Sequence, residues 1–362
     1  MIGKRLPILI LEEAIVYLGR NMGKYATIKD VAELAGTTAG TVSYVLNNKQ
    51  GRYISGETRT KVLEAAKQLD YVKSNSASVL KGGNRNLISI LVPQFENQFF
   101  TRIIVAAERL FMAHGYDLVI SNTDDNPEKE KEILERMASQ RVEGLIITPT
   151  SNGAENTAFL RRNDVPMVIV DRPLIGVENY HWVTTNNYRC GYVGASYLLQ
   201  KGHKDITYIG WDSGIPDLDS RLEATKKAFG DFGVDGSRLH VEMDAFSAMG
   251  GYQATERALE HHPTALFYGF NMQAIGGVNC LRDKKLSVPE DVSVVMIGSP
   301  EWAVTGNNQY THVDMGDMAL GRKAAEVLLD QIQGRLPVKN GSHFIQDCTL
   351  MEGATVNDLS IT

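Results

Sequence analysis

Residues 27–47, TIKDVAELAGTTAGTVSYVLN, decide the fold of the N-terminal part of the chain. Thr27 can cap a helix, and Asp30, three positions later, can bond back to the cap amide, so a helix is predicted to begin here. Gly36 permits a sharp reversal of the backbone, and Thr38 begins a second helix. The buried face of this second helix is predicted to comprise Val42, Val45 and Leu46.

A third helix is predicted after Ser55, where apolar residues recur at helical spacing at Val62, Leu63, Ala66 and Leu69. Two short helices joined by an Ala-Gly turn and closed by a third helix have helix-turn-helix geometry, in which the second helix lies in the major groove. Its exposed positions offer hydroxyl groups to phosphates or bases and small side chains to base methyls: Thr38, Ala39, Gly40, Thr41, Ser43 and Tyr44. A three-helix bundle with a polar face is the alternative.

The charge of the chain is unevenly distributed. Residues 22–86 contain ten Lys and Arg against five Asp and Glu, a net of +5, whereas the whole chain carries −6. A basic end on an acidic protein is typical of a region that faces a polyanion such as DNA. A basic surface without a partner fits the same numbers.

The order of short motifs in this region resembles the DNA-binding region of the lactose-repressor (LacI/GalR) family. The motifs are D-V-A-x-x-A-G at 30–36, T-V-S at 41–43, V-L-N at 45–47, T-R-x-x-V at 58–62 and L-x-Y at 69–71. The resemblance implies a sequence-specific transcriptional regulator that binds double-stranded DNA. We therefore assign DNA contacts to the exposed positions of the second helix named above and to Thr27, Asn47, Thr58, Tyr71, Ala77 and Leu80.

Residues 73–86 are interpreted as a hinge. The apolar stretch around Ala77 and Leu80 ends at Gly82-Gly83 and is too short for an isolated helix, so we expect it to fold only when paired with its twin on DNA. The resemblance implies that Leu80 wedges into the minor groove; the alternative is that Leu80 packs against the following domain. Lys73-Ser74 replaces the family's Pro-Asn, Ser78 its hinge Arg and Tyr44 an Arg of several relatives, which indicates a different operator sequence.

From residue 87 onward, strand-like runs alternate with helical runs in two series. This alternation predicts two doubly wound subdomains with parallel sheets and a ligand between them, at the carboxyl ends of the strands. The predicted fold is thus an all-α helix-turn-helix domain and a hinge, followed by an α/β periplasmic-binding-protein-like core. We expect an extension over 1–21, the helix-turn-helix over 22–72 and the core over 87–355. The subdomains are predicted at 87–185 plus 316–342, and at 186–315 plus 343–355.

Several classes of protein lack their signatures in this sequence. No GxGxxG follows the strand predicted at 88–93, and there is no GxxxxGK[ST], which argues against a dehydrogenase or a nucleoside triphosphatase. Cys190, Cys280 and Cys348 are far apart, which argues against a zinc site or a disulfide framework and suits a reducing cytoplasm. The apolar run at 6–18 is too short to span a membrane. We therefore expect a cytoplasmic protein that is not an enzyme and has no cofactor or metal.

The resemblance continues through N-x-F-F at 97–100, VDR at 170–172, GH at 202–203 and VPEDVSVV at 288–295. It implies the fold of periplasmic sugar-binding proteins, so a solute-binding protein is an alternative. The effector-binding positions that it implies are Phe99, Asn186, Arg221, Phe246, Asn271 and Gly298. Asn186 and Gly298 stand where the family commonly has acidic residues that bind sugar hydroxyls, Met272 where Asp is usual and Met315 where Gln is frequent. The effector is expected to be a sugar or sugar derivative, with a phosphorylated or non-sugar metabolite left open.

These features together predict a homodimer that binds a pseudo-palindromic operator. We expect ligand in the cleft to rotate the subdomains and so order or melt the two hinges. The tail after Asp330 has no leucine heptads, which disfavours a tail-mediated tetramer. The function predicted is repression of a carbohydrate-utilisation operon. A catabolite-control-type regulator, with a phosphorylated carrier protein as corepressor, is the alternative.

Overall fold

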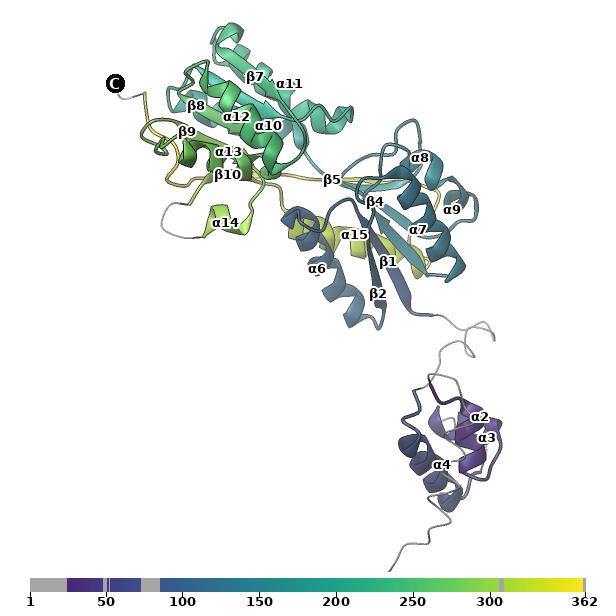
Figure 1. The fold of residues 1–362 in the computed structure, drawn as a ribbon. Helices are drawn as coiled ribbons and strands as arrows, with labels where there is room; N and C mark the ends of the chain where they lie inside the picture. The colour runs from purple at the N-terminus through teal and green to yellow at the C-terminus, as the bar shows by residue number, and fades with distance from the viewer. Residues whose placement is uncertain (1–24, 48–50, 52, 73–84, 306–308, 361–362) are drawn as a thin grey trace, which may run out of the picture. The chain divides into compact units, whose positions relative to one another are not determined.

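The computed structural model describes residues 25–47, 51, 53–72, 85–305 and 309–360. The chain divides into two compact units, Met1–Arg85 and Asn86–Thr362 (Figure 1). The predicted extension over 1–21 and most of the predicted hinge, including Ala77 and Leu80, lie outside the described residues.

The first unit contains the three predicted helices, α2 (Ile28–Leu34), α3 (Ala39–Leu46) and α4 (Gly56–Gln68). The capping box at the start of α2 is confirmed: the amide of Thr27 donates to a carboxylate oxygen of Asp30 at 2.7 Å, and the Thr27 hydroxyl accepts from the Asp30 amide. Gly36 adopts φ +62° in the turn, a conformation that glycine reaches without steric cost. Thr38 caps α3 through the amide of Thr41.

The core of this unit confirms most of the predicted buried face. The buried residues are Val31, Ala32, Ala35, Val42, Val45, Val62 and Ala65. Leu63, one of the four apolar residues found at helical spacing in the sequence, does not join this core, because its side chain is 50% exposed. The buried stripe of α4 runs from Val62 through Ala65, Ala66 and Leu69, at spacings of three, four and seven. Leu63 is one position off that stripe and faces away.

The second unit consists of two lobes. The sheet of the first lobe has the order β11-β5-β4-β3-β1-β2, and all its pairings are parallel. Its strands are β1 (Leu87–Val92), β2 (Asp117–Asn122), β3 (Gly144–Ile147), β4 (Met167–Val170), β5 (His181–Thr185) and β11 (His343–Gln346). Its helices are α6 (Gln98–Ala113), α7 (Pro127–Ser139), α8 (Gly153–Asn156), α9 (Ala158–Arg162) and α15 (Asp317–Ile332).

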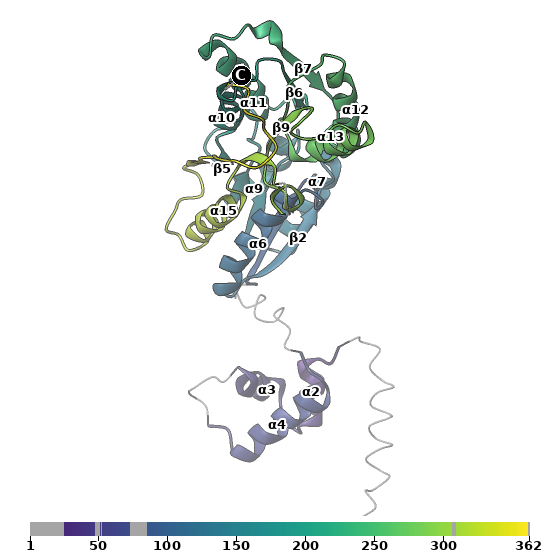
Figure 2. The same ribbon diagram turned by 90° about the vertical axis from the view of Figure 1, so that its left-hand side faces the viewer.

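Helices cover both faces of this sheet because the strand side chains alternate. Ile88 and Ile90 of β1 pack in one apolar cluster with α6 and α15, whereas Leu91 packs in another with α7. Helices α6 and α15 lie side by side on their face (Figures 1 and 2). This lobe is therefore doubly wound, as predicted.

The sheet of the second lobe has the order β12-β10-β9-β8-β6-β7 and is parallel except for β12, which runs antiparallel to β10. Its strands are β6 (Ile206–Gly210), β7 (Leu239–Met243), β8 (Ala265–Tyr268), β9 (Ser293–Ile297), β10 (Thr311–Asp314) and β12 (Thr349–Met351). Its helices are α10 (Asn187–Gln200), α11 (Pro216–Asp231), α12 (Ala248–Leu259), α13 (Asn271–Asp283), the short α14 (Glu301–Val304) and the 3₁₀ helix η1 (Gly236–Arg238). Helices α10 and α11 pack as one pair, and α12 and α13 as another.

The chain crosses between the lobes three times: from β5 to α10, from β10 to α15 and from β11 to β12. The last crossing corrects the predicted assignment of residues 343–355 to the second lobe. The first part of that segment, β11, pairs with β5 in the first sheet, and only β12 joins the second. Without β11, β5 would be an edge strand of the first sheet with unpaired backbone groups. β11 pairs with these groups.

Candidate effector cleft and DNA-binding face

A cavity that is partly open to solvent lies between the two lobes. Its walls come from segments that directly follow β1, β4, β6, β8 and β9, so it sits at the carboxyl ends of parallel strands, where open α/β sheets bind ligands. The lining residues are Asn97, Gln98, Phe99, Phe100, Asp171, Arg172, Trp211, Leu218, Arg221, Phe246, Phe270, Asn271, Ile297, Gly298, Ser299, Pro300, Met315 and Asp317.

Five of the six predicted effector positions line this cavity: Phe99, Arg221, Phe246, Asn271 and Gly298. The structure does not bring Asn186 to it. The Asn186 side chain caps α10 by accepting from the amide of Arg189 at 3.0 Å, and its own amide donates to Gln346 at 2.8 Å. A short polar side chain at the start of a helix is used locally, and the neighbouring Asn187 is the residue that contacts Arg221 of the cavity wall.

Asn187 holds the guanidinium group of Arg221, which is 3% exposed. Nε and Nη2 of Arg221 both donate to Oδ1 of Asn187, at 2.8 and 2.6 Å, and Nη1 donates to the carbonyl of Gly269 at 2.7 Å. The Asn187 amide nitrogen in turn donates to Asp217 at 2.5 Å. Arg221 also lies 4.6 Å from the centre of the Phe270 ring. The cation is thus largely satisfied by the protein itself.

Asp171 is a buried carboxylate on the cavity wall, only 5% exposed. Within the part of the chain that the structure describes, nothing donates a hydrogen bond to this carboxylate; the backbone carbonyl of Asp171 accepts from Trp182 and Thr184. Burial raises its pKa, against the pull of Arg172 and Arg221. Burial also raises the pKa of Asp217 to about 6, despite the hydrogen bond from Asn187.

Three aromatic rings of the second lobe also line the cavity. Trp211 stacks on Phe246 with centroids 5.1 Å apart and planes 27° from parallel, and Phe270 meets both rings edge-on. From the first lobe, Arg172 reaches over the Trp211 ring at 5.7 Å while its Nη1 pairs with Asp125 at 2.5 Å. An aromatic wall opposite a few fixed polar groups is the usual composition of a site for a small ring-shaped ligand.

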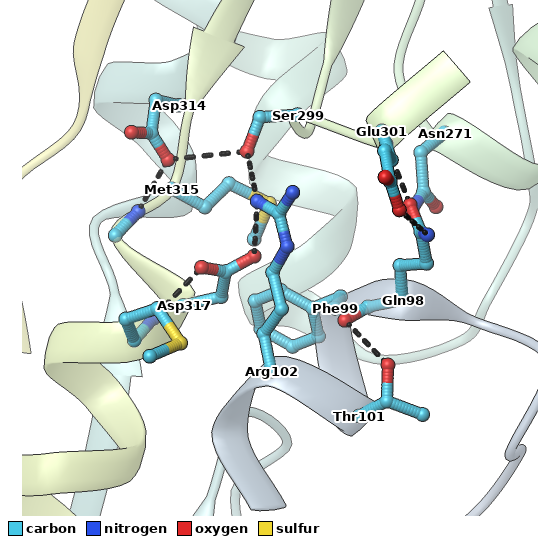
Figure 3. Close-up of polar contacts among 12 residues, drawn as sticks. Gln98, Phe99, Thr101, Arg102, Asn271, Ser299, Glu301, Asp314, Met315 and Asp317 are labelled. Carbon is cyan, nitrogen blue, oxygen red and sulfur yellow. Dashed lines mark hydrogen bonds and ion pairs between the residues drawn. The ribbon is translucent and has the colours of Figure 1, made fainter. Parts of the chain in front are cut away.

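Polar contacts bridge the two lobes beside the cleft, and Figure 3 shows those of Gln98 with Glu301 and of Arg102 with Ser299 and Asp317. Asn271 donates to Asn97 at 2.9 Å, and the amide of Glu301 donates to the side chain of Gln98 at 2.6 Å. Arg102 donates to Ser299 at 3.3 Å and pairs with Asp317 at 3.5 Å. Because Arg102 and Asp317 belong to the first lobe and Ser299 to the second, this group holds the lobes together.

Gly298 occupies a position that a side chain would strain. Its φ is +101°, and a Cβ atom there would lie 3.1 Å from Cβ of Asn271. The residue here is glycine, so this position supplies no carboxylate to the cavity, and glycine adopts this backbone conformation without steric cost.

Five residues were not predicted from the sequence: Asp171, Trp211 and Phe270, which line the cavity, and Asn187 and Asp217, which form the network behind Arg221. Asp171 was noted only as part of the VDR motif, although it follows directly after the buried strand β4. Trp211 likewise follows β6. The position of a polar or aromatic residue just after a strand was the signal that could have identified both.

The predicted DNA-binding residues of the first unit fall into two groups. Thr27, Thr38 and Gly40 are exposed, and Ala39, Thr41, Ser43, Tyr44, Asn47, Thr58 and Tyr71 are half-buried. Several support the unit itself: Asn47 donates to the carbonyl of Ser43 at 2.6 Å, Thr58 shares a hydrogen bond with Ser55 at 2.9 Å, and Tyr71 packs against the core. Thr38 and Gly40, at the start of α3, are the exposed residues among the predicted positions of this helix.

Comparisons with known proteins agree with this architecture. The profile "Bacterial regulatory proteins, lacI family" matches residues 27–74, and "Periplasmic binding protein-like domain" matches 195–356. The HTH-type transcriptional repressor PurR of Histophilus somni is 31% identical over 310 residues, covering 85% of this chain and 92% of that protein. The lac repressor dimer bound to operator and the anti-inducer ONPF superposes with a TM-score of 0.77 at 25% identity, covering 92% of this chain and all of that one. A regulator from Enterococcus faecium with bound ribose has the same fold, with a TM-score of 0.69 at 24% identity over 75% of this chain and 99% of that one.

A helix-turn-helix unit followed by a two-lobed, periplasmic-binding-protein-like core defines a class of transcriptional regulators. This chain belongs to the lacI family of bacterial regulatory proteins. The predicted resemblance and fold class are thereby confirmed. No helix among the described residues is both long and apolar enough to cross a bilayer. In the same residues, no group of three or more His, Cys, Asp or Glu side chains is arranged to hold a metal.

Proposed function

We propose that the protein is a cytoplasmic repressor that binds a pseudo-palindromic DNA site as a homodimer, with the N-terminal turn of α3 in the major groove. The exposed Thr38 and Gly40 and the net charge of +5 over residues 22–86 support DNA contact. The names of its relatives support repression. The structure of the lac repressor with both operator and anti-inducer supports control by a small ligand.

The effector that fits the cleft is an uncharged, polar ring compound such as a sugar derivative. The observation that carries this proposal is a cavity lined both by the Asp171 carboxylate of the first lobe, to which no described residue donates a hydrogen bond, and by the Trp211–Phe246 stack of the second lobe. A buried carboxylate favours ligand groups that donate hydrogen bonds, and an aromatic face favours the C–H surface of a ring. Among the described residues that line the cavity, the two arginines spend most of their donors on the protein: three nitrogens of Arg221 donate to Asn187 and Gly269, and Nη1 of Arg172 pairs with Asp125, which leaves few donors for a phosphate.

Isothermal titration of the full-length protein tests the effector proposal. The panel contains neutral sugars, nucleobases and the phosphate esters of the same sugars. We expect a neutral compound to bind and its phosphate ester to bind at least about tenfold more weakly, because Asp171 repels the anion. Asp171→Asn is expected to weaken that neutral ligand by about 10-fold or more, which corresponds to one charge-assisted hydrogen bond. Tighter binding of a phosphate ester, or no binding across the panel, would contradict the proposal.

Selection from random-sequence duplexes tests the DNA-binding part. The protein is expected to enrich a site with two-fold symmetry, since the half-sites mirror the symmetry of a dimer. Enrichment of an asymmetric site, or of none, would contradict it. A control selection with Thr38→Ala and Thr41→Ala together is expected to weaken enrichment, because both hydroxyl groups lie at the start of α3.

A further inference from the structure

Two of the three cysteines, far apart in sequence, meet beside the lobe crossings. Cys190 lies in the first turns of α10, just after the first crossing, and Cys348 lies between β11 and β12, in the third. Both are free thiols buried in the same apolar cluster. Sequence analysis treated them as unrelated because only the fold brings the two crossings together.

Contacts just before the two cysteines hold these segments in register. The amide of Asn186 donates to the carbonyl of Gln346 at 2.8 Å, and Arg189 pairs with Asp347 at 2.9 Å. Cys190 directly follows Arg189, and Cys348 directly follows Asp347. The backbone contact and the ion pair thus bring the two buried thiols to the same place beside the crossings.

The two thiols have unequal acidity. The interaction with Cys190 lowers the pKa of Cys348, whereas the interaction with Cys348 and burial raise the pKa of Cys190. Cys348 is therefore the sulfur that ionises first, and a thiolate is the nucleophile in thiol oxidation. The Arg189–Asp347 ion pair that precedes the two cysteines is exposed, whereas Cys348 is only 5% exposed, so an oxidant must reach the sulfur from this surface.

We propose that Cys190 and Cys348 form a redox-modification site that takes hydrogen peroxide and closes to a disulfide between two of the three lobe crossings. The Cys348 thiolate attacks one peroxide oxygen, breaking the O–O bond and giving a sulfenic acid and water after protonation. The Cys190 sulfur then attacks the sulfenic sulfur and expels a second water as the S–S bond forms. Two thiols are oxidised and one peroxide is reduced; a thiol reductant reverses the step by exchange.

The disulfide would lie close to the residues that hold Arg221 at the cleft. Cys190 is one helical turn from Asn187, which holds Arg221, and the next residue, Gly191, packs so closely that a Cβ would lie 2.0 Å from the Arg221 carbonyl oxygen. A bond between two crossings restricts the rotation of one lobe against the other. Resting on the proposed function, this restriction is expected to change DNA affinity.

The test begins with the full-length protein and does not depend on DNA. Reduced protein is treated with hydrogen peroxide, denatured, alkylated with N-ethylmaleimide and weighed intact. Reduced protein is expected to label at all three cysteines, and oxidised protein at Cys280 alone, with peptides joined through Cys190 and Cys348. Cys280→Ser is the matched control and is expected to oxidise normally, whereas Cys348→Ser is expected to form no intramolecular disulfide. Retention of three labelled thiols, a disulfide that includes Cys280, or overoxidation of Cys348 without a disulfide would overturn the proposal.

The second readout is the affinity for a duplex recovered by the random-sequence selection. Oxidation is expected to change the Kd at least about fivefold, the lower end of usual allosteric coupling, and to leave Cys348→Ser unchanged. A mapped disulfide with an unchanged Kd for the duplex would overturn the proposed effect of the disulfide on DNA binding. If the reduced protein bound no duplex, the proposed function would fail, while the mapped disulfide would still establish the redox site.

Discussion

Replacing Asn187 by alanine tests whether the network behind the cleft holds Arg221 as described. The change removes the acceptor of Nε and Nη2 of Arg221 and the donor to Asp217. Hydrogen bonds to charged groups contribute about 1.5–3 kcal/mol each, and breaking a buried charged network costs about 3–5 kcal/mol. Because Arg221 keeps its bond to Gly269, we expect the free energy of unfolding to fall by about 3 kcal/mol.

The neighbouring Asn186 supplies the control. Its side chain makes only the helix cap of α10, so Asn186→Ala is expected to cost about 1 kcal/mol. Urea denaturation of both full-length variants, followed by tryptophan fluorescence, measures the difference. The neutral effector identified by titration should also bind Asn187→Ala more weakly than Asn186→Ala. Equal loss of stability in the two variants, or a larger loss in Asn186→Ala, would refute the reasoning.

Three further predictions concern other parts of the chain. The pKa of Asp217 rises from 3.8 in the unfolded chain to about 6 in the folded one, so between these values the native state holds one extra proton. The free energy of unfolding should therefore fall by roughly 3 kcal/mol as pH rises through this window. Asp217→Asn should remove this part of the pH dependence, as measured by urea titrations at each pH. Gly298→Ala should lower the urea midpoint more than Gly214→Ala, since both have positive φ but only Gly298 is crowded; equal effects would argue against crowding. Val62→Ala should destabilise the first unit by about 2 kcal/mol, and Leu63→Ser by less than about 0.5 kcal/mol, as seen by circular dichroism during heating; the reverse order would contradict the assigned face of α4.

The parts of the fold that depend on local signals were predictable from sequence. The capping box of Thr27 and Asp30 and the turn at Gly36 involve residues within a few positions of each other. The strands of the two lobes are short apolar runs separated by helical patterns, and these gave the doubly wound core. The third lobe crossing was not predictable, because β11 alternates exposed and half-buried residues as an edge strand does in either sheet.

The site was predictable only where the resemblance gave the right position. Phe246 and Asn271 line the cavity, but Asn186 and Asn187 are adjacent, and only the start of α10 decides which one caps the helix and which one holds Arg221. The pairing of Cys190 with Cys348 depends on two chain crossings coming together, and no local pattern encodes that.

The measurement that tests the account most directly is the Kd of the full-length protein for its selected duplex, with and without the neutral ligand found by titration. The account predicts a change of at least about fivefold, and the duplex should change the ligand's Kd by the same factor, because coupling between two sites is reciprocal. The change should shrink in Asp171→Asn at the same ligand concentration. An unchanged DNA affinity at saturating ligand would contradict control of the repressor through the cleft.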